Sequence, residues 1–264
     1  MFRRGFGHFL RTAASLQWRE EAIDLRSDAA AWPDLPGPER EQTLWLVAGF
    51  VIGERSVAAE LEPFASASAA ADADVAACFE AQAIDEARHA RFFERALSEV
   101  TGTEATDEAL RGLVERPVLE LFEQRLSAAS RALADDREQL DAAVALYHLL
   151  LEGVFFTAGQ LALLELLDED APALPGLRRG VELVLRDERW HIGFGASVLA
   201  HMGAREDAVA GLPGEAGVVL AAWGDAVPDQ IGRHVLELHR RRLRAAGLGA
   251  AGGPAAPPRA YSDA

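Results

Sequence analysis

The sequence contains no lysine, because all 26 of its basic residues are arginine. Without a lysine amine, Schiff-base chemistry is excluded. The chain also has a single cysteine, Cys78, so it cannot form an intrachain disulfide or hold an iron–sulfur cluster or zinc ion through several thiolates. Cys78 lies in an alanine-rich stretch with helical periodicity, where a buried and inert thiol is expected.

Positive charge is scarce as well, since 26 Arg stand against 42 Asp and Glu and leave a net charge of −16. Such a chain repels phosphate backbones, so we expect no nucleic-acid partner. No stretch approaches about 18 uninterrupted apolar residues, which predicts no membrane span. The Arg3-Arg4 pair is not followed by an apolar segment before Glu20, so we expect no export signal and a cytoplasmic location.

Isoleucine, threonine and tyrosine are rare, whereas alanine and leucine are abundant and 50% of the residues are hydrophobic. This composition favours helices over sheet, and 264 residues suffice for one large core. We therefore predict an all-α protein in three parts. These are an irregular N-terminal segment over 1–37, a single helical-bundle domain over 38–247, and a disordered tail rich in Gly, Ala and Pro over 248–264.

Apolar residues with helical spacing predict five main helices, and one or two more over 205–247. Pro63 is expected to bend or break the first helix near its end. Asp72 is a plausible cap for the second helix, and Gly102 a plausible stop. The five predicted helices cover about 39–69, 72–101, 105–134, 138–167 and 177–202.

One pentapeptide pattern occurs twice, as Asp85-Glu86-Ala87-Arg88-His89 and as Asp187-Glu188-Arg189-Trp190-His191. In a helix, residues three apart share a face, so each Glu-x-x-His presents a carboxylate and an imidazole to one point. Chance predicts about 0.7 such spacings in a chain of this composition, so one copy would mean little. Two copies, each preceded by Asp, indicate the two halves of a two-metal site.

Two further carboxylates, Glu54 and Glu152, lie within otherwise apolar runs of predicted helices. Burying a lone carboxylate costs free energy unless it is paired or bound to a metal. Ferritin-like di-iron bundles use one Glu from each of two helices and a Glu-x-x-His from each of two others. We therefore predict that six side chains hold two metal ions: Glu54, Glu86, His89, Glu152, Glu188 and His191.

The predicted metal pair is Mn/Fe or Fe/Fe, because iron and manganese both accept carboxylate and imidazole ligands. Glu86 and Glu188 are best placed to bridge the ions, and the other two glutamates would be terminal. Asp85 and Asp187 could each accept the free ring N–H of the opposite histidine and fix its tautomer. For any single Glu-x-x-His, a solvated salt-bridge pair is the alternative interpretation.

Five segments resemble the small subunit of class I ribonucleotide reductase, and more closely the ligand-binding oxidases that share its fold. They are LQWREEAIDLRSDAAAW, VAGFVIGERSVAAELEPF, AQAIDEARH, YHLLLEGVFFTAGQ and RDERWHIGFG, and the resemblance covers roughly residues 16–200. It implies a ferritin-like helical bundle of the reductase small-subunit type. It also implies a dinuclear metal centre that activates dioxygen.

Tyrosine separates the two branches of this group. Radical-generating reductase subunits usually carry a tyrosine one turn after the first histidine, where this chain has Phe93. The oxidase group is similar in carrying a valine one turn after the first glutamate and a tyrosine five residues before the third. Val57 and Tyr147 occupy those places, so the resemblance implies an ether cross-link between them. Without the resemblance, both would be read as core residues.

The spacing between Tyr147 and Glu152 does not align on a regular α-helix, and a π-bulge would bring the tyrosine to the site. The resemblance further implies a long-chain fatty acid or other small apolar molecule near the metals. The aromatic and leucine side chains that could line its tunnel are Phe93, Leu151, Phe155 and Phe156.

We therefore predict a homodimeric oxidoreductase, a dioxygen-activating oxidase that performs two-electron C–H oxidation. The first alternative is a radical-generating reductase small subunit, which would need a catalytic partner. The second is a ferritin-like metal-binding bundle without an organic substrate. Arylamine N-oxygenases usually add a histidine one turn before the second Glu-x-x-His, where this chain has Val184.

Overall fold

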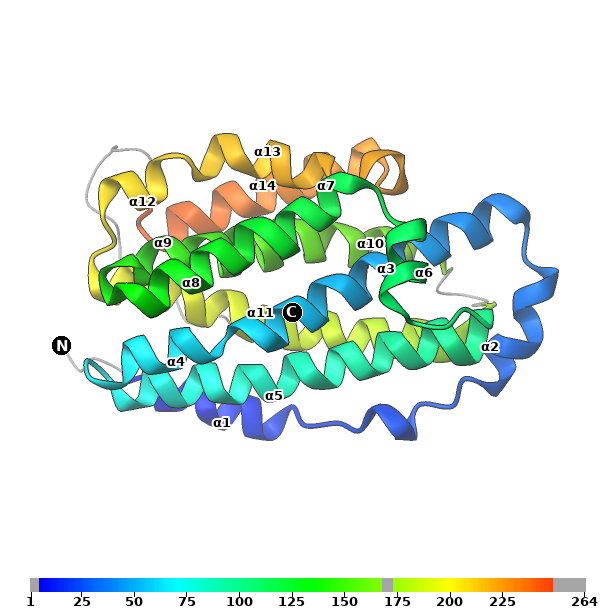
Figure 1. Cartoon of the computed structure of the whole chain (residues 1–264), viewed down its shortest axis with the longest axis horizontal. Helices are drawn as coiled ribbons and strands as arrows, with labels where there is room; N and C mark the ends of the chain where they lie inside the picture. The colour runs from blue at the N-terminus through cyan, green and yellow to red at the C-terminus, as the bar shows by residue number, and fades with distance from the viewer. Residues whose placement is uncertain (1–4, 168–172, 249–264) are drawn as a thin grey trace.

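The computed structural model describes residues 5–167 and 173–248, and every regular element within these two ranges is helical. The long helices lie side by side along the long axis of the molecule (Figure 1). The helices that carry the predicted metal ligands are α3 (Gly37–Glu60), α5 (Ala73–Arg95), η6 (Ala145–Phe156) and α11 (Pro175–Met202). The all-α, ferritin-like bundle expected from the sequence is confirmed.

The predicted helix boundaries at Pro63 and Asp72 are confirmed. α3 ends at Glu60, and α4 (Glu62–Ala69) begins with Pro63 in its first turn. The Asp72 side chain accepts hydrogen bonds from the backbone N–H groups of Asp74 and Val75 at the start of α5. A π-helical turn, η3 (Ala96–Val100), extends α5 to Gly102, whose φ of 73° ends the helix.

The segment 1–37 is not irregular as predicted. It contains α1 (Gly7–Ser15) and α2 (Arg26–Ala31) as well as two short 3₁₀ turns. Phe9 of α1 packs edge-on against Phe194 of α11, with ring centroids 5.6 Å apart. The apolar face of this short helix holds it to the bundle. The helix is too short for its hydrophobic periodicity to be recognised in the sequence.

The prediction of a single helix at about 105–134 is also wrong. The structure has α6 (Asp107–Leu113), then α7 (Arg116–Leu119), which continues through η4 (Glu120–Leu126) into α8 (Ser127–Asp135). Pro117 lies in the first turn of α7, where its missing N–H costs nothing, rather than inside one long helix. The tail predicted over 248–264 lies outside the described residues, apart from Leu248.

The helix that carries Glu152 has a π-helical stretch at its centre. α9 (Leu140–Val144) leads into η6, twelve π-helical residues, and then into α10 (Thr157–Leu166). The π-bulge predicted between Tyr147 and Glu152 is therefore confirmed. Side chains donate to three of its carbonyl groups: Thr157 Oγ1 to Glu152 at 2.8 Å, Arg242 Nη1 to Gly153 at 2.7 Å, and Trp223 Nε1 to Phe155 at 2.8 Å.

Two of these donors come from the C-terminal part of the chain. There α13 (Leu212–Ala221) and α14 (Asp229–Ala245) follow the short α12 (Glu206–Ala210) and pack over η6 (Figure 1). Trp223, between α13 and α14, is fully buried and stacks on Phe155 with ring centroids 4.1 Å apart. Gly49 and Gly159 leave room for the indole, because a Cβ at either position would lie 2.6 Å from it.

One helical stretch, Arg137–Leu166, is long and apolar enough to cross a membrane by length and composition alone, with a mean hydropathy of 1.6. Yet 78% of that apolar window is buried inside the bundle. It contains η6, so its apolar residues face the neighbouring helices α11, α13 and α14. The composition is that of a core helix, which is hydrophobic on every side.

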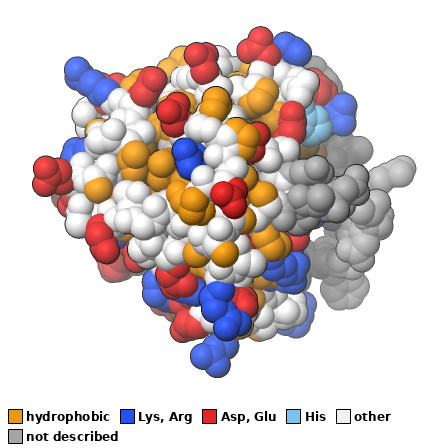
Figure 2. Space-filling model, turned by 90° about the vertical axis from the view of Figure 1, so that its right-hand side faces the viewer, with side chains coloured by type: hydrophobic (Ala, Val, Ile, Leu, Met, Phe, Trp, Pro, Cys, Tyr) orange, Lys and Arg blue, Asp and Glu red, His pale blue; other side chains and the backbone are white. Residues whose placement is uncertain are grey.

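Charges of both signs are interspersed on the end face of the bundle that Figure 2 shows. Small apolar areas lie between them on this face. Surface ion pairs of the bundle include Arg116 with Glu120 at 2.7 Å and Arg111 with Glu123 at 2.7 Å. Although the net charge is −16, the acidic side chains do not form one continuous surface on that face.

Replacing Trp223 with alanine is expected to lower the free energy of unfolding by about 3–5 kcal/mol, because it removes a buried aromatic side chain and leaves a cavity. Denaturant unfolding followed by circular dichroism measures the change. Trp45→Ala is the matched control. Trp45 is only partly buried, so its replacement should lower the free energy of unfolding clearly less. Equal losses in the two variants would contradict the anchoring role of Trp223.

Cys78 is expected to be inert in the folded protein. Burial, together with the nearby carboxylates of Asp74 and Asp72, raises the pKa of the Cys78 thiol to about 12. Only the thiolate is nucleophilic, so alkylation by iodoacetamide at pH 8 should be at least about a hundredfold slower in the native than in the unfolded protein. Mass spectrometry of timed samples gives both rates, and equal rates would show that the thiol is accessible.

Candidate metal centre

The six predicted metal ligands converge in the middle of the bundle. α3 supplies one glutamate, η6 supplies another, and α5 and α11 each supply a Glu-x-x-His pair. All six side chains are at most 1% exposed: Glu54, Glu86, His89, Glu152, Glu188 and His191. Four helices therefore close around a polar space that water does not reach from outside.

The donor atoms form two overlapping groups, and the atoms within each group lie within 4.8 Å of one another. The first group is Glu54, Glu86, His89 and Glu188, and the second is Glu86, Glu152, Glu188 and His191. Glu86 and Glu188 belong to both groups, which is the position that a bridging carboxylate needs. The other two glutamates each belong to one group, as terminal ligands would.

Several of these atoms are buried without any hydrogen bond. They are both carboxylate oxygens of Glu54, one oxygen each of Glu152 and Glu188, and Nδ1 of His89 and of His191. Buried polar atoms in native proteins nearly always have a partner, because leaving them unpaired costs free energy. Two cations between the groups would satisfy all six atoms, so these residues fit a dinuclear centre.

The electrostatics of the cluster also favour cations. Burial raises the pKa of Glu54, Glu152 and Glu188, and neighbouring carboxylates raise it further. Burial alone would lower the pKa of both histidines, but the carboxylates that face them outweigh it and raise the pKa of each. A buried cluster with this excess of negative charge is stabilised when positive ions enter it.

Asp85 and Asp187 lie behind the histidines in a crossed arrangement. Oδ2 of Asp187 is 3.4 Å from Nε2 of His89, and Oδ2 of Asp85 is 3.4 Å from Nε2 of His191. Each aspartate therefore accepts from the histidine of the other Glu-x-x-His. A hydrogen on Nε2 leaves Nδ1, the atom that faces the carboxylate cluster, free to bind a metal.

Arg88 joins the two aspartates. Its Nη2 is 2.6 Å from Oδ1 of Asp85 and 3.1 Å from Oδ2 of Asp187. Each aspartate also accepts from an indole, Asp85 from Trp190 at 3.2 Å and Asp187 from Trp18 at 2.7 Å. Sequence analysis missed Trp18, because no periodicity connects it with a residue 169 positions away.

Val57 and Tyr147 are both buried beside the cluster. Val57 lies one helical turn after Glu54 on α3. The Tyr147 hydroxyl donates to Oε1 of Glu86 at 2.8 Å and accepts from Nε2 of Gln82 at 2.8 Å. The phenol oxygen is therefore in contact with one of the two carboxylates that belong to both donor groups.

The residues suggested as a tunnel lining are part of the packed core. Phe93 stacks on Phe50 with ring centroids 4.7 Å apart, and Phe155 stacks on Trp223. None of the four is exposed: Phe93, Leu151, Phe155 and Phe156. In this structure their aromatic contacts are with one another and with their helical neighbours.

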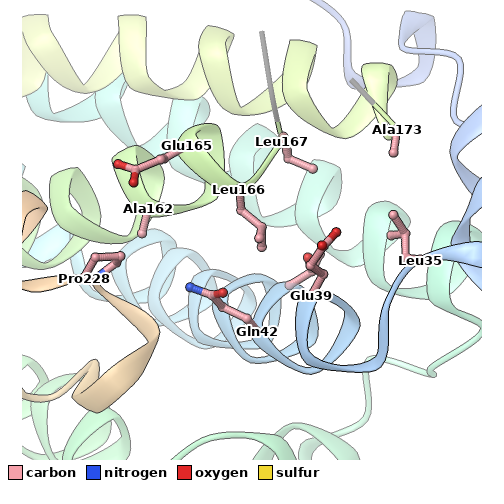
Figure 3. A pocket seen from close by; sticks show the side chains of 10 residues that line it. Leu35, Glu39, Gln42, Ala162, Glu165, Leu166, Leu167, Ala173 and Pro228 are labelled. Atoms are coloured by element: carbon pink, nitrogen blue, oxygen red, sulfur yellow. The ribbon is translucent and has the colours of Figure 1, made fainter. Parts of the chain in front are cut away.

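A cavity of about 490 Å³ lies instead between α3 and α10 (Figure 3). Leucine side chains line it together with the carboxylates of Glu39 and Glu165, and Gln42 extends toward it from α3 (Figure 3). None of the four suggested tunnel residues is among those that line it.

The family model that matches the chain is that of the ribonucleotide reductase small chain, over residues 4–212. The chain belongs to this family. The matched range holds all six donor residues and ends at the first residue of α13. Family membership and the buried donor set together make the protein an oxidoreductase with a dinuclear metal site.

Solved structures share the fold. An R2-like ligand-binding oxidase with an aerobically reconstituted Mn/Fe cofactor is 21% identical, with a TM-score of 0.79 over 91% of this chain and 92% of that chain. A variant with an anaerobically reconstituted Mn/Fe cofactor is 22% identical, with a TM-score of 0.78 over 90% and 91%. A variant with a non-activated Mn/Mn cofactor gives the same four values.

Metal-free protein loaded with Mn(II) and Fe(II) without oxygen is expected to bind two equivalents and to gain at least about 5 °C in Tm, because the ions bind only the folded state. Elemental analysis and thermal unfolding measure the two quantities. His191→Ala should retain about one equivalent, since it removes the nitrogen donor of one group.

The matched control for this variant is His201→Ala. His201 lies on the same helix, α11, but is exposed and outside the donor groups. It should bind two equivalents like the wild type. Undiminished metal binding by His191→Ala would show that the cluster does not hold the ions as described.

Proposed function

We propose that the protein is a dioxygen-activating oxidase whose six donors hold an Mn/Fe or Fe/Fe pair. When bound, such a reduced pair supplies electrons and Lewis acidity to dioxygen. The observation that carries the proposal is the overlap of two donor groups at Glu86 and Glu188, with the Tyr147 hydroxyl hydrogen-bonded to Glu86. Mn/Fe cofactors in R2-like ligand-binding oxidases of the same fold support it.

In this proposal Glu54 and His89 belong to one ion, and Glu152 and His191 to the other. Glu86 and Glu188, which belong to both donor groups, would be shared by the two ions. Asp85 and Asp187 keep each histidine in the tautomer that binds through Nδ1. The protein thus provides a rigid site in which ligand positions are set before the ions enter.

Val57 and Tyr147 are proposed to be joined by an ether bond. Val57 loses the hydrogen of its β-carbon, Tyr147 loses its hydroxyl hydrogen, and a carbon–oxygen bond forms. Dioxygen accepts these two electrons and two protons, and with two electrons from the reduced ions and two solvent protons it becomes two waters. The hydrogen bond from Tyr147 to Glu86 gives the phenol proton a route to an acceptor.

Aromatic side chains keep this region dry. The Tyr147 ring packs edge-on against Phe64 at 5.8 Å between centroids, and Phe64 packs against Phe79 at 5.6 Å. All three rings are fully buried. Excluding water protects a strong oxidant from side reactions and directs it to a C–H bond beside the site.

We further propose that the ligand is a small apolar molecule such as a long-chain fatty acid, and that the protein acts as a homodimer in the cytoplasm. Ligand-binding oxidases of the same fold support the first part, and the carboxylate of such a molecule could bind the ions. Mass spectrometry of an organic extract tests the ligand, and sedimentation tests the dimer.

Aerobic loading of the metal-free protein with manganese and iron is expected to consume dioxygen and to remove two hydrogen atoms from the chain. Peptide mass spectrometry should then find the Val57 and Tyr147 peptides joined. Tyr147→Phe should stay unlinked, because it lacks the phenol oxygen. Val57→Ala should stay unlinked as well, because the C–H bonds of its β-carbon are primary and stronger than the tertiary C–H bond of valine.

Loading without oxygen is the control and should leave all peptides separate. Unlinked wild-type peptides after dioxygen has been consumed would reject the cross-link but keep the oxidase. Failure to consume dioxygen would reject the oxidase itself. A long-lived tyrosyl radical in place of the cross-link would favour a reductase small subunit.

A further inference from the structure

The amide of Gln82 is buried beside the donor cluster, one helical turn before Glu86 on α5. Its Nε2 lies 2.8 Å from the Tyr147 hydroxyl oxygen and 2.7 Å from Oε1 of Glu152. Its Oε1 lies 3.1 Å from Nε2 of His148. One side chain therefore contacts the reacting phenol, a metal donor and a histidine that belongs to neither donor group.

The neighbours of this amide determine which end is nitrogen. Oε1 of Glu152 accepts from Nε2 of Gln82 at 2.7 Å, so the NH₂ group of Gln82 faces Glu152. The second N–H then points to the Tyr147 oxygen. The Tyr147 hydroxyl donates its own hydrogen to Glu86 at 2.8 Å. The hydrogen bonds therefore run in one direction, from Gln82 through Tyr147 to Glu86.

His148 holds the amide from the opposite side. Oε1 of Gln82 can only accept, so Nε2 of His148 carries the hydrogen. The imidazole is fully buried, and burial lowers the pKa of His148 to about 3, which keeps it neutral. A neutral ring with its hydrogen on Nε2 fixes the rotation of the Gln82 amide.

The bundle also provides a fitted slot for this ring. Gly195 lies one turn after His191 on α11, and a Cβ there would be 2.2 Å from Cγ of His148. Phe79 and Phe194 pack edge-on against the imidazole, each with centroids 5.8 Å away. The helix that supplies a metal donor thus leaves space for His148 in one orientation.

We propose that Gln82 and His148 are a positioning pair that directs the Tyr147 hydroxyl hydrogen to Glu86 rather than to Glu152. Two carboxylates compete for one phenol hydrogen. Gln82 donates to Glu152 and to the phenol oxygen at the same time, which leaves Glu86 as the acceptor. The effect of this pair on cross-linking rests on the proposed function. The hydrogen bonds themselves are present in the protein without metal.

The first test uses the fact that the chain has only two tyrosines, Tyr147 and Tyr261. In a Tyr261→Phe background, tyrosine labelled with ¹³C at Cζ gives one resonance, whose shift reports the hydrogen bonds of the Tyr147 hydroxyl. In metal-free protein, Gln82→Met should move this resonance, because it removes the donor at nearly constant volume. An unmoved resonance would overturn the proposal.

Gln160→Met is the matched control. Gln160 is equally buried, and its Nε2 lies 3.5 Å from Oε1 of Glu188. Its loss should leave the Tyr147 resonance in place. A shift as large as that of Gln82→Met would mean that any buried glutamine near the cluster has the same effect, and would count against the pair.

Two variants of His148 separate positioning from packing. His148→Gln places an amide N–H near the position of Nε2, so the wild-type resonance should be retained, whereas His148→Leu should shift it as Gln82→Met does. Thermal unfolding confirms that each variant is folded. If the protein does not fold with a replacement at Gln82 or His148, the variants at the other position still test the proposal. Identical Tyr147 resonances in the two His148 variants would overturn the role of the histidine.

The second test measures the rate of Val57–Tyr147 cross-linking in protein loaded with two metal equivalents. Gln82→Met and His148→Leu should each be about tenfold slower, the effect of about one hydrogen bond on a positioned group. The double variant should be no slower than Gln82→Met, since His148 acts through Gln82. An additive double variant would contradict that coupling.

The two tests distinguish a failure of the proposed function from a failure of the positioning pair. If wild-type protein does not cross-link, the proposed function is wrong, and the resonance of the metal-free protein still decides the arrangement around Tyr147. If wild-type protein cross-links and both variants react at its rate, the proposed function stands and the positioning pair is overturned.

Discussion

Four carboxylates buried in one space are the constraint on which the rest of the bundle depends. Removing each charge from water costs several kcal/mol, and their mutual repulsion adds to that cost. The apolar contacts of four helices have to offset it whenever cations are absent. Because the donors come from α3, α5, η6 and α11, the site exists only when these helices are assembled, so metal binding and folding are coupled.

The aspartates make the two halves of the centre mechanically dependent on each other. Asp85 belongs to α5 but accepts from His191 of α11, and Asp187 belongs to α11 but accepts from His89 of α5. Arg88 then bonds both aspartates. A rotation of either helix would therefore disturb the histidine nitrogen atoms of both donor groups.

Much of this arrangement could be predicted from the sequence, because helical spacing translates directly into shared faces. The two Glu-x-x-His patterns and the lone Glu54 and Glu152 were enough to predict which side chains the structure brings together. The five-residue step to Tyr147 predicted π-helix only together with the family resemblance, which places Tyr147 at the site. What spacing cannot show is contact between distant segments. Gln82, His148 and Trp18 have no pattern of their own, and their partners become visible only when the helices are packed.

Two of the hydrogen bonds to the carbonyl groups of η6 come from residues outside the range that the family model matches. Trp223 and Arg242 lie beyond residue 212, where the family match ends, yet both donate to backbone carbonyl groups just after Glu152, those of Phe155 and Gly153. A shortened chain that kept all six donor residues would lose these supports and expose the π-helical stretch to water. The C-terminal helices thus support the metal centre, and substitutions in residues that do not contact the donors could change its properties.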